Sequence, residues 1–338
     1  MKFNKNILLP LTLSLFISSA FANFDSIQEL QKTAKKGQVS AQHNLGNAYY
    51  NGDGVVRSYE KAFEWYSKAA AQGYALAQYN LGVMYAKGKG VVRSYEKAFE
   101  WYSKAATQGD AQAQYNLGVM YSNGYGVVRS YEKAFEWYSK AAAQGNADAQ
   151  YNLGNAYSNG YGVVQSYEKA FEWYSKAAAL GTAEAQYNLG FMYENGRGVV
   201  QSYEKAFEWY SKAAALGTAE AQKALGMMYF KGYGVVQSYE KALEWYSKAA
   251  AQGDAQAQNN LGVMYANGEG ITRNTALANE WYLKAANNGN SNAQVNIAQN
   301  YLNGSNGLPK NRVQAINWLK KAANNGHAQA KLMLAGVQ

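Results

Sequence analysis

The chain has no cysteine, only two histidines and only two prolines. Without cysteine it cannot form disulfides, use a thiolate as a nucleophile or build a cysteine metal site. Two histidines leave almost no material for a histidine metal site or a histidine-based catalyst. With so few prolines, long helical stretches are interrupted only by regularly placed glycines. We therefore expect no catalytic group and no cofactor.

Long apolar runs are also missing, except near the N-terminus. Lys2 and Lys5 precede a mostly apolar stretch from Ile7 to Ile17, which leads into the sequence SSAFA at residues 18–22. This order, with its A-x-A ending, predicts a secretory signal peptide over residues 1–22 that is cleaved after Ala22. The apolar stretch is too short to span a bilayer, although an uncleaved anchor is the alternative. We expect a periplasmic or secreted protein without stable membrane insertion after cleavage.

The formal net charge of +9 is unevenly spread. Residues 74–109 carry five basic and two acidic side chains, a net of +3, and residues 290–326 carry a net of +4. The sequence between these two segments is close to neutral. Nucleic-acid binding calls for a continuous basic stripe. Two separate basic segments do not form one, so no nucleic acid is expected as a partner.

What the chain does contain is one sequence that returns again and again. SYEKAFEWYSKAA stands at residues 58–70, 94–106, 130–142, 166–178 and 202–214, and with one substitution at 238–250. All eight tryptophans fall at the same place in this pattern, the first seven 36 residues apart and the last 37. A fixed period of this size predicts a repeat architecture, in which each unit buries its apolar faces against its neighbours.

Each repeat contains two amphipathic helices. In the second repeat, residues 75–87 form the first helix and residues 94–107 the second. The second helix has apolar residues at i, i+3, i+4 and i+7, and the first has Gln78, Leu81, Gly82 and Tyr85 at this spacing. Ser94 is a good N-cap for the second helix. Glu100 and Lys104 have the spacing of an i,i+4 ion pair. The sequence therefore predicts two antiparallel helices per repeat, joined by a short Gly-x-Gly turn.

A glycine lies in the interior of the first helix of seven repeats, where it costs about 1 kcal/mol relative to alanine. The glycines are Gly46, Gly82, Gly118, Gly154, Gly190, Gly226 and Gly262. We attribute them to a close approach of two helices at which a Cβ would clash. Ala298, at the equivalent place of the last repeat, meets the same demand for a small residue.

Half-repeats are expected at both ends of the array. The pattern predicts an N-terminal cap helix within residues 23–37, eight repeats over residues 38–326 and a C-terminal cap helix over residues 327–338. The expected fold class is all-α, built from stacked helix–turn–helix repeats of 36 residues.

The motif A-x-A-Q-Y-N-L-G followed by Y-E-K-A-F-E-W-Y-x-K-A-A strongly resembles the Sel-1-like repeat, a relative of the tetratricopeptide repeat. The resemblance implies a right-handed α-solenoid whose first helices line a concave groove. It also implies a non-enzymatic scaffold that binds a protein or peptide partner. A cysteine-rich branch of secreted relatives is linked to peptidoglycan or β-lactam binding, and this chain lacks the paired cysteines of that branch.

The first helix carries the candidate ligand-binding residues, numbered here from position 1 at Ala75 and its equivalents. Position 6 is Asn44, Asn80, Asn116, Asn152, Asn188, Asn260 and Asn296, and position 5 includes Tyr79, Tyr115, Tyr151 and Tyr187. Position 9 varies most and includes Val83, Val119, Asn155 and Phe191. The amides could pair with the backbone of an extended peptide, and the tyrosines add rigid contact area. In the alternative interpretation, asparagine and tyrosine bond and pack between neighbouring helices.

Three functions remain open from the sequence. The first is an exported scaffold that binds a protein or peptide. The second is an envelope protein that binds or hydrolyses peptidoglycan or a β-lactam, and the third is a host-interaction factor. His43 and His327 have no acid or nucleophile at motif spacing, and both are predicted as surface residues.

Overall fold

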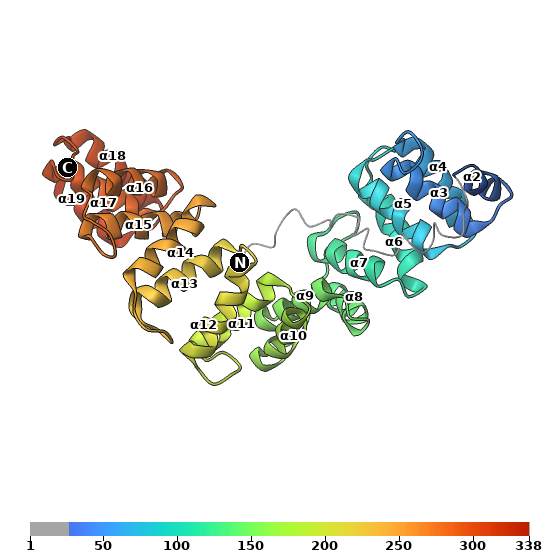
Figure 1. Ribbon diagram of the computed structural model, residues 1–338, viewed down its shortest axis with the longest axis horizontal. Coiled ribbons are helices and arrows are strands. Elements are labelled where there is room, and N and C mark those ends of the chain that lie inside the picture. Colours follow the sequence, from blue (N-terminus) through green and yellow to red (C-terminus); the bar gives the residue numbers. More distant parts are fainter. Residues whose placement is uncertain (1–26, 338) are drawn as a thin grey trace. The chain divides into compact units, whose positions relative to one another are not determined.

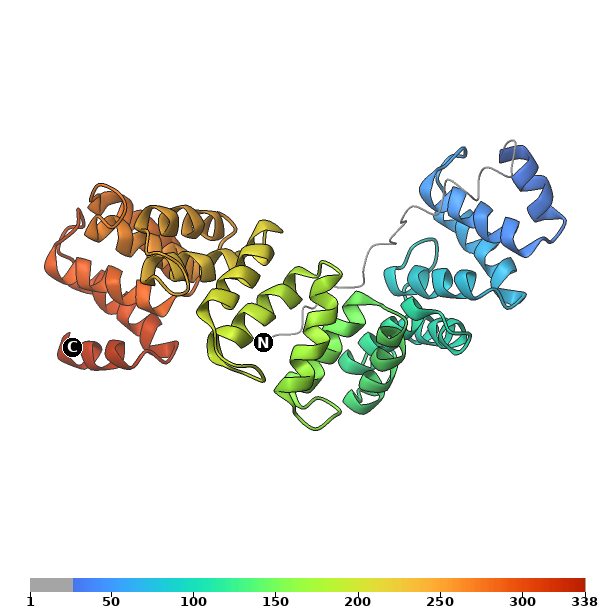
Figure 2. The same ribbon diagram turned by 60° about the horizontal axis from the view of Figure 1, so that its bottom comes forward.

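The computed structural model of the chain describes residues 27–337, which form eighteen helices and no strand (Figure 1). The predicted signal peptide and the first residues of the predicted N-terminal cap lie outside this described range. The chain divides into two compact halves, residues 1–173 and residues 174–338. Each half is a stack of antiparallel helix pairs (Figures 1 and 2). The prediction of an all-α solenoid of 36-residue repeats is confirmed.

The first helix of each repeat contains thirteen residues. These helices are α3 (Val39–Asn51), α5 (Ala75–Lys87), α7 (Ala111–Asn123), α9 (Ala147–Asn159), α11 (Ala183–Asn195), α13 (Ala219–Lys231), α15 (Ala255–Asn267) and α17 (Ser291–Asn303). The second helices are α4 (Tyr59–Ala71), α6 (Tyr95–Thr107), α8 (Tyr131–Ala143), α10 (Tyr167–Ala179), α12 (Tyr203–Ala215), α14 (Tyr239–Ala251), α16 (Thr275–Asn287) and α18 (Arg312–Asn324). The flanking helices are α2 (Ile27–Lys35) and α19 (Ala328–Val337).

The capping residue of the second helix behaves as the sequence predicts. Ser94 precedes α6 with an extended backbone, and its hydroxyl accepts a hydrogen bond from the Lys97 amide at 3.1 Å. The i,i+4 pairing of this helix forms in the sixth repeat, where Nζ of Lys248 lies 2.6 Å from Oε1 of Glu244. In the second repeat the Lys104 ammonium lies 4.1 Å from the centre of the Trp101 ring. A cation over an indole face gains electrostatic attraction. The tryptophan therefore holds the lysine on the outer side of the stack.

The glycine inside the first helix makes room for a tyrosine ring of the second helix. This holds at Gly46, Gly82, Gly118, Gly190, Gly226 and Gly262. A Cβ added to Gly118 would lie 2.5 Å from Cδ1 of Tyr138, a contact too short for real atoms. Equivalent clashes occur between Gly82 and Tyr102 and between Gly226 and Tyr246. These tyrosines are buried, so their rings cannot swing away. The close approach predicted from the glycines is thus an approach of a first-helix backbone to an aromatic ring.

The last repeat replaces both partners of this contact. Ala298 stands at the place of the glycine and Leu319 at the place of the tyrosine. Both are fully buried and belong to the same hydrophobic cluster. The smaller leucine leaves room for the alanine methyl group. The two positions therefore change together within this one chain.

The turn between the two helices connects each repeat with the preceding one. Gly124 and Gly126 have left-handed φ angles of 74° and 65°, which glycine adopts without strain. A side chain on Gly126 would overlap the backbone of Tyr95 in the preceding repeat. Between the two glycines, the Tyr125 ring stacks on the Tyr95 ring with their centres 5.0 Å apart. These glycines therefore form a packed interhelical turn, as their sequence pattern indicates.

A glutamine at position 4 joins successive repeats through its side-chain amide. Gln78 donates from Nε2 to the Ala70 carbonyl of the preceding repeat at 3.3 Å. Its Oε1 accepts from Nε2 of Gln108, at position 34 of its own repeat, at 2.7 Å. Six repeats have such an amide at position 34: Gln72, Gln108, Gln144, Gln252, Asn288 and Asn325. Because both ends of the buried glutamine are bonded, its burial costs little.

Leu216 interrupts this arrangement in the fifth repeat. It occupies position 34, and the buried Oε1 of Gln186 has no hydrogen-bond donor in the described part of the chain. Replacing Leu216 with glutamine should restore the bond, and we expect the free energy of unfolding to rise by about 1 kcal/mol. Urea unfolding followed by circular dichroism measures this change. Gln144→Leu, the reverse change in the third repeat, should lower stability, and no difference in either variant would contradict the assignment.

Candidate functional site

The asparagines at position 6 lie against the preceding repeat. Asn80 and Asn116 are buried. Asn80 places Nδ2 3.1 Å from Nε2 of His43 and 3.4 Å from Oδ1 of Asn47. The Asn116 amide hydrogen-bonds the Tyr79 hydroxyl. In each case position 6 of one repeat contacts position 5 of the repeat before it.

The same pairing returns elsewhere in the array. The Asn152 amide contacts the Tyr115 hydroxyl, and Asn296 donates from Nδ2 to Oδ1 of Asn259 at 3.3 Å. Asn188 is buried, whereas Asn44, Asn152, Asn260 and Asn296 are half-buried. An amide ladder therefore exists, but in these pairs its hydrogen bonds join repeat to repeat. This geometry agrees with the alternative interpretation of the asparagine pattern, and a role in ligand binding stays a prediction.

The tyrosines at position 5 pack on the buried tyrosines of the second helix. The ring centres of Tyr79 and Tyr102 are 5.8 Å apart, and those of Tyr187 and Tyr210 are 5.4 Å apart. Tyr115 is buried, whereas Tyr79, Tyr151 and Tyr187 keep part of their surface. Burial raises the pKa of Tyr79 to about 12. The Tyr79 phenol therefore stays neutral at ordinary pH and acts as a packing and hydrogen-bonding group.

The second-helix tyrosine also extends its hydroxyl toward the first helix. The Tyr66 hydroxyl donates to Oδ1 of Asn47 at 2.7 Å, and the Tyr210 hydroxyl donates to Oε2 of Glu194 at 2.6 Å. The glycine at position 8 makes this path possible, since the ring passes directly beside the helix backbone. The hydroxyl groups of second-helix tyrosines therefore bond side chains of the first helix.

Position 9 differs in exposure from repeat to repeat. Val83 and Asn155 are buried, whereas Val119 and Phe191 are half-buried. Met227, at position 9 of the sixth repeat, is 38% exposed. The Arg197 guanidinium lies 5.1 Å from the centre of the Phe191 ring. Of the position 9 side chains, Val119, Phe191 and Met227 therefore offer more apolar surface than Val83.

The prediction that His43 is a surface residue is wrong. It takes position 5 in the first repeat and is 92% buried, with 8% of its surface exposed. Its ring lies 5.8 Å from the Tyr66 ring and 5.2 Å from the Tyr74 ring, centre to centre. Burial lowers its pKa to about 4, because a charged imidazole would lose its hydration. Helical spacing alone could not show this, since the residues around His43 come from three different helices.

His327 is half-buried at the start of α19. Its Nδ1 accepts a hydrogen bond from the Ala330 amide at 3.3 Å. It therefore serves as the N-cap of the last helix.

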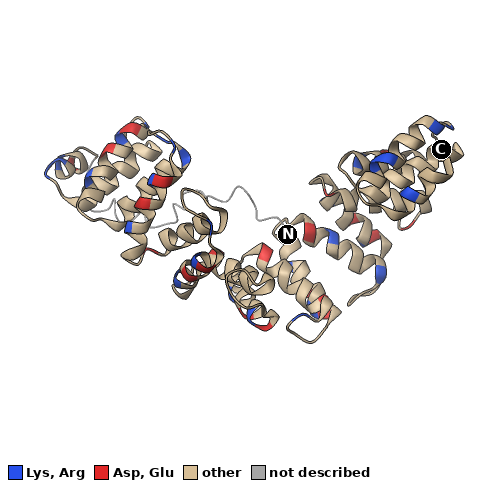
Figure 3. Ribbon diagram, turned by 180° about the vertical axis from the view of Figure 1, so that it is seen from behind, with Lys and Arg blue, Asp and Glu red and all other residues tan. Residues whose placement is uncertain are grey.

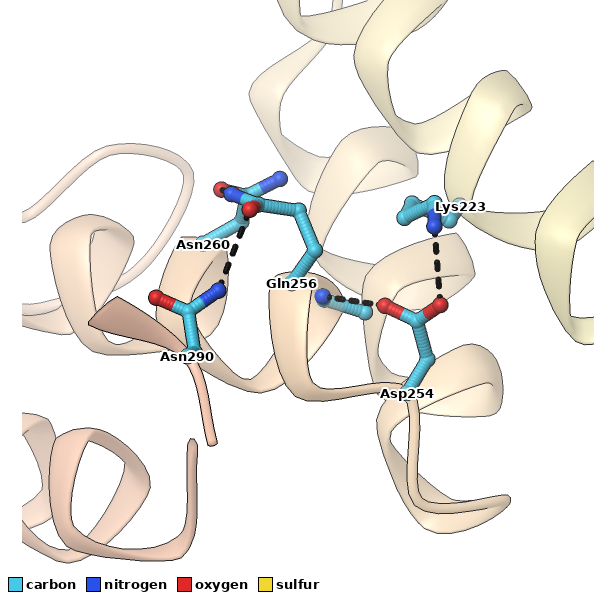
Figure 4. A network of polar contacts seen from close by, with 6 residues as sticks. Lys223, Asp254, Gln256, Asn260 and Asn290 are labelled. Atoms are coloured by element: carbon cyan, nitrogen blue, oxygen red, sulfur yellow. Dashed lines mark hydrogen bonds and ion pairs between the residues drawn. The ribbon is translucent and has the colours of Figure 1, made fainter. Parts of the chain in front are cut away.

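A charged group replaces the tyrosine at position 5 in the sixth repeat. Lys223 donates from Nζ to Oδ2 of Asp254 at 2.9 Å, and the other carboxylate oxygen accepts from the Ala257 amide at 2.7 Å (Figure 4). Beside it, Gln256 bridges Asn260 and Asn290 at 3.0 and 3.1 Å. This network fixes the start of α15 and was not foreseen from the sequence. The sequence feature that could have indicated it is the change from tyrosine to lysine at position 5 of the sixth repeat.

The described residues contain no cluster of three or more metal-ligating side chains. No helix among residues 27–337 is long and apolar enough to cross a membrane. Acidic and basic residues are scattered over the helices of both halves (Figure 3). The geometry of the described residues is that of a stacked repeat array, in which each repeat contacts its neighbours.

The Sel1 repeat family matches eight successive segments of the chain. They are residues 39–74, 75–110, 111–146, 147–182, 183–218, 219–254, 255–290 and 291–327. The chain therefore belongs to the Sel1 repeat family, and the predicted resemblance is confirmed. Proteins of this family are generally protein–protein interaction scaffolds, and the fold is typically non-enzymatic.

Two solved structures are closely similar to this chain. One is c5321, described as a protective antigen present in uropathogenic Escherichia coli strains displaying an SLR fold. It is 39% identical with a TM-score of 0.84, over 92% of this chain and 67% of c5321. The other is a Sel1 repeat protein from Oxalobacter formigenes, 33% identical with a TM-score of 0.71, over 92% of this chain and 90% of that one. No curated protein matches the chain.

Proposed function

We propose that the protein is an exported, non-enzymatic scaffold that binds a peptide or protein along the faces of its first helices. The observation that supports this most is the contrast between positions within one helix. Positions 4 and 8 are nearly constant because they pack between helices, whereas position 9 changes in character and remains partly exposed at Val119, Phe191 and Met227. Because packing does not determine the side chains at position 9, these side chains can determine which partner binds.

Export is part of the same proposal. It rests on the predicted signal peptide, with Asn23 as the first residue of the mature chain. The periplasm and the cell exterior are the two destinations of this pathway.

A role in contact with a host is a second candidate. It is favoured by the likeness to c5321, which is described as a protective antigen of uropathogenic strains. An antigen that protects must be reached by the immune system, so exposure outside the cell would link the two proteins.

Variants at position 9 test the binding proposal. Asparagine occurs naturally at this position as Asn47 and Asn155, so Val119→Asn, Phe191→Asn and Met227→Asn should fold. We expect the triple variant to capture its main partner from envelope extract at least about tenfold less than the wild-type mature chain, because the apolar contacts are lost. Quantitative mass spectrometry of the captured proteins gives the ratio.

A matched control changes exposed valines that lie in the turns. Val128→Thr and Val200→Thr imitate Thr272, the natural residue at the equivalent place of the seventh repeat. This variant should capture as much as wild type. Equal capture by the triple position 9 variant, with unchanged circular dichroism, would remove the first-helix face from the proposal.

A further inference from the structure

Two successive repeats carry the same local departure from the pattern. The sequence LGTAE stands at residues 180–184 and again at residues 216–220. In the structure, Leu180 lies in the turn between α10 and α11, and Leu216 in the turn between α12 and α13 (Figure 1). Each leucine is 57% exposed. Both occupy position 34, where six other repeats place the amide that bonds the buried glutamine.

The leucine leaves a buried acceptor without a donor. Gln186 is buried, its Nε2 donates to the Ala178 carbonyl at 3.3 Å, and its Oε1 has no donor among the described residues. In the sixth repeat the equivalent place is filled by Gln252, which donates to Oε1 of Gln222 at 2.8 Å and to the Gly217 carbonyl at 2.9 Å. In the fifth repeat Oε1 of Gln186 therefore lacks the donor that Gln252 provides to Gln222 in the sixth repeat.

The fourth repeat shows the same combination. Oε1 of Gln150 also lacks a donor in the described part of the chain, and the residue thirty positions further along is Leu180. In the six repeats with an amide at position 34, the glutamine Oε1 is bonded. The unmet acceptor therefore accompanies the exposed leucine in both cases.

Negative charge accompanies the leucines. Glu184 and Glu220 are exposed at position 2, four residues after each leucine. The other repeats have no glutamate there, but Ser40, Leu76, Gln112, Asp148, Gln256 and Asn292. Glu220, Glu194 and Asp254 all act on Tyr187, whose pKa is raised by burial and by these charges. Each exposed leucine is therefore followed, four residues later, by an exposed carboxylate.

We propose that Leu180, Leu216, Glu184 and Glu220 form a docking surface, the leucine–glutamate patch, for a partner segment in which arginine or lysine alternates with aliphatic residues. Aliphatic side chains cover the two leucines, and the cations pair with the two carboxylates. Arginine suits this place because its guanidinium has five donors and no acceptor.

A second copy of the chain does not fit the patch as well. Pairing the patch with itself would bring glutamates against glutamates, which is unfavourable. The proposal adds a surface at the turns that is separate from position 9 on the first helices, so the two surfaces can fail independently.

Fluorescence anisotropy with labelled twelve-residue peptides tests the patch on the full mature chain. Three peptides of equal length alternate Arg with Leu, Arg with Ser, and Glu with Leu. We expect the Arg/Leu peptide to bind at least about tenfold more tightly than either of the others. Binding of the Arg/Ser peptide with equal strength would reduce the interaction to general charge attraction, and absence of Arg/Leu binding would also overturn the proposal.

Variants locate the binding. Leu180→Gln with Leu216→Gln should weaken Arg/Leu binding at least about tenfold while raising stability, so misfolding cannot explain the loss. Glu184→Gln with Glu220→Gln should weaken binding and flatten its salt dependence. The controls are Val236→Thr and Glu208→Gln with Glu244→Gln, which change exposed residues outside the patch and should bind like wild type. Wild-type affinity in the leucine variant, or equal loss in the controls, would refute the patch.

Discussion

Replacing Gly118 with alanine is expected to lower the free energy of unfolding by about 2 kcal/mol. The new methyl group would lie 2.5 Å from the buried Tyr138 ring, and overpacking of this kind costs about 1–3 kcal/mol. The higher helix propensity of alanine offsets only about 1 kcal/mol of a larger cost. Urea unfolding followed by circular dichroism gives the difference.

Gly336 provides the matched control. It is also helical, in α19, but an added Cβ would have no atom within 4 Å. Gly336→Ala should therefore leave stability unchanged or raise it slightly through helix propensity. Equal effects of alanine at Gly118 and Gly336 would show that helix propensity, and not the ring contact, decides the outcome.

Stability of the N-terminal repeats is expected to fall by about 3 kcal/mol between pH 7.5 and pH 4, through His43 alone. The folded pKa of about 4 lies below the model value of 6.5 because burial disfavours the charged imidazole. The unfolded chain therefore binds more protons in this window. The contribution of the neutral histidine is fully present above pH 6.5 and is lost as the pH falls toward 4.

His43→Tyr isolates this effect, since tyrosine is the residue at position 5 in four other repeats. Carboxylates titrate in both proteins, so the quantity to compare is the difference in unfolding free energy between wild type and variant. This difference should change by about 3 kcal/mol from pH 7.5 to pH 4. With only two histidines in the chain, the imidazole resonances can be assigned directly. A His43 titration midpoint near 6.5 would contradict its burial.

The sequence predicted the parts of the fold that depend on contacts within one helix. The period located the repeats, Ser94 marked a helix start, and the glycine at position 8 indicated a close approach. The sequence could not predict which residue lies against the glycine, because the Tyr138 ring beside Gly118 belongs to another helix, twenty residues further along the chain. Helical periodicity shows which face is buried but not what covers it.

The candidate site was less predictable for the same reason. The bond from Asn80 to His43 joins residues 37 positions apart, and the bond from Gln108 to Gln78 joins residues 30 apart. The 3.6-residue period of a helix cannot predict contacts over either separation. The face opposite the core of one repeat is therefore partly covered by a neighbouring repeat: His43 lies against Asn80 of the next repeat and Asn116 against Tyr79 of the preceding one. Leu180 and Leu216, in the turns, depart most clearly from the repeat pattern. They could be recognised only once the structure showed that the amide at position 34 bonds the buried glutamine at position 4.

The residues that recur from repeat to repeat serve stacking, and the position 8 glycine interlocks with the second-helix tyrosine. A double-mutant cycle in the third repeat tests it most directly, with Gly118→Ala, Tyr138→Leu and both together. The double variant reproduces the natural pair Ala298 and Leu319. We predict that it is more stable than the sum of the single losses by at least about 1 kcal/mol. Additivity of the two losses within about 0.5 kcal/mol would show that the residues do not interlock and would contradict the account.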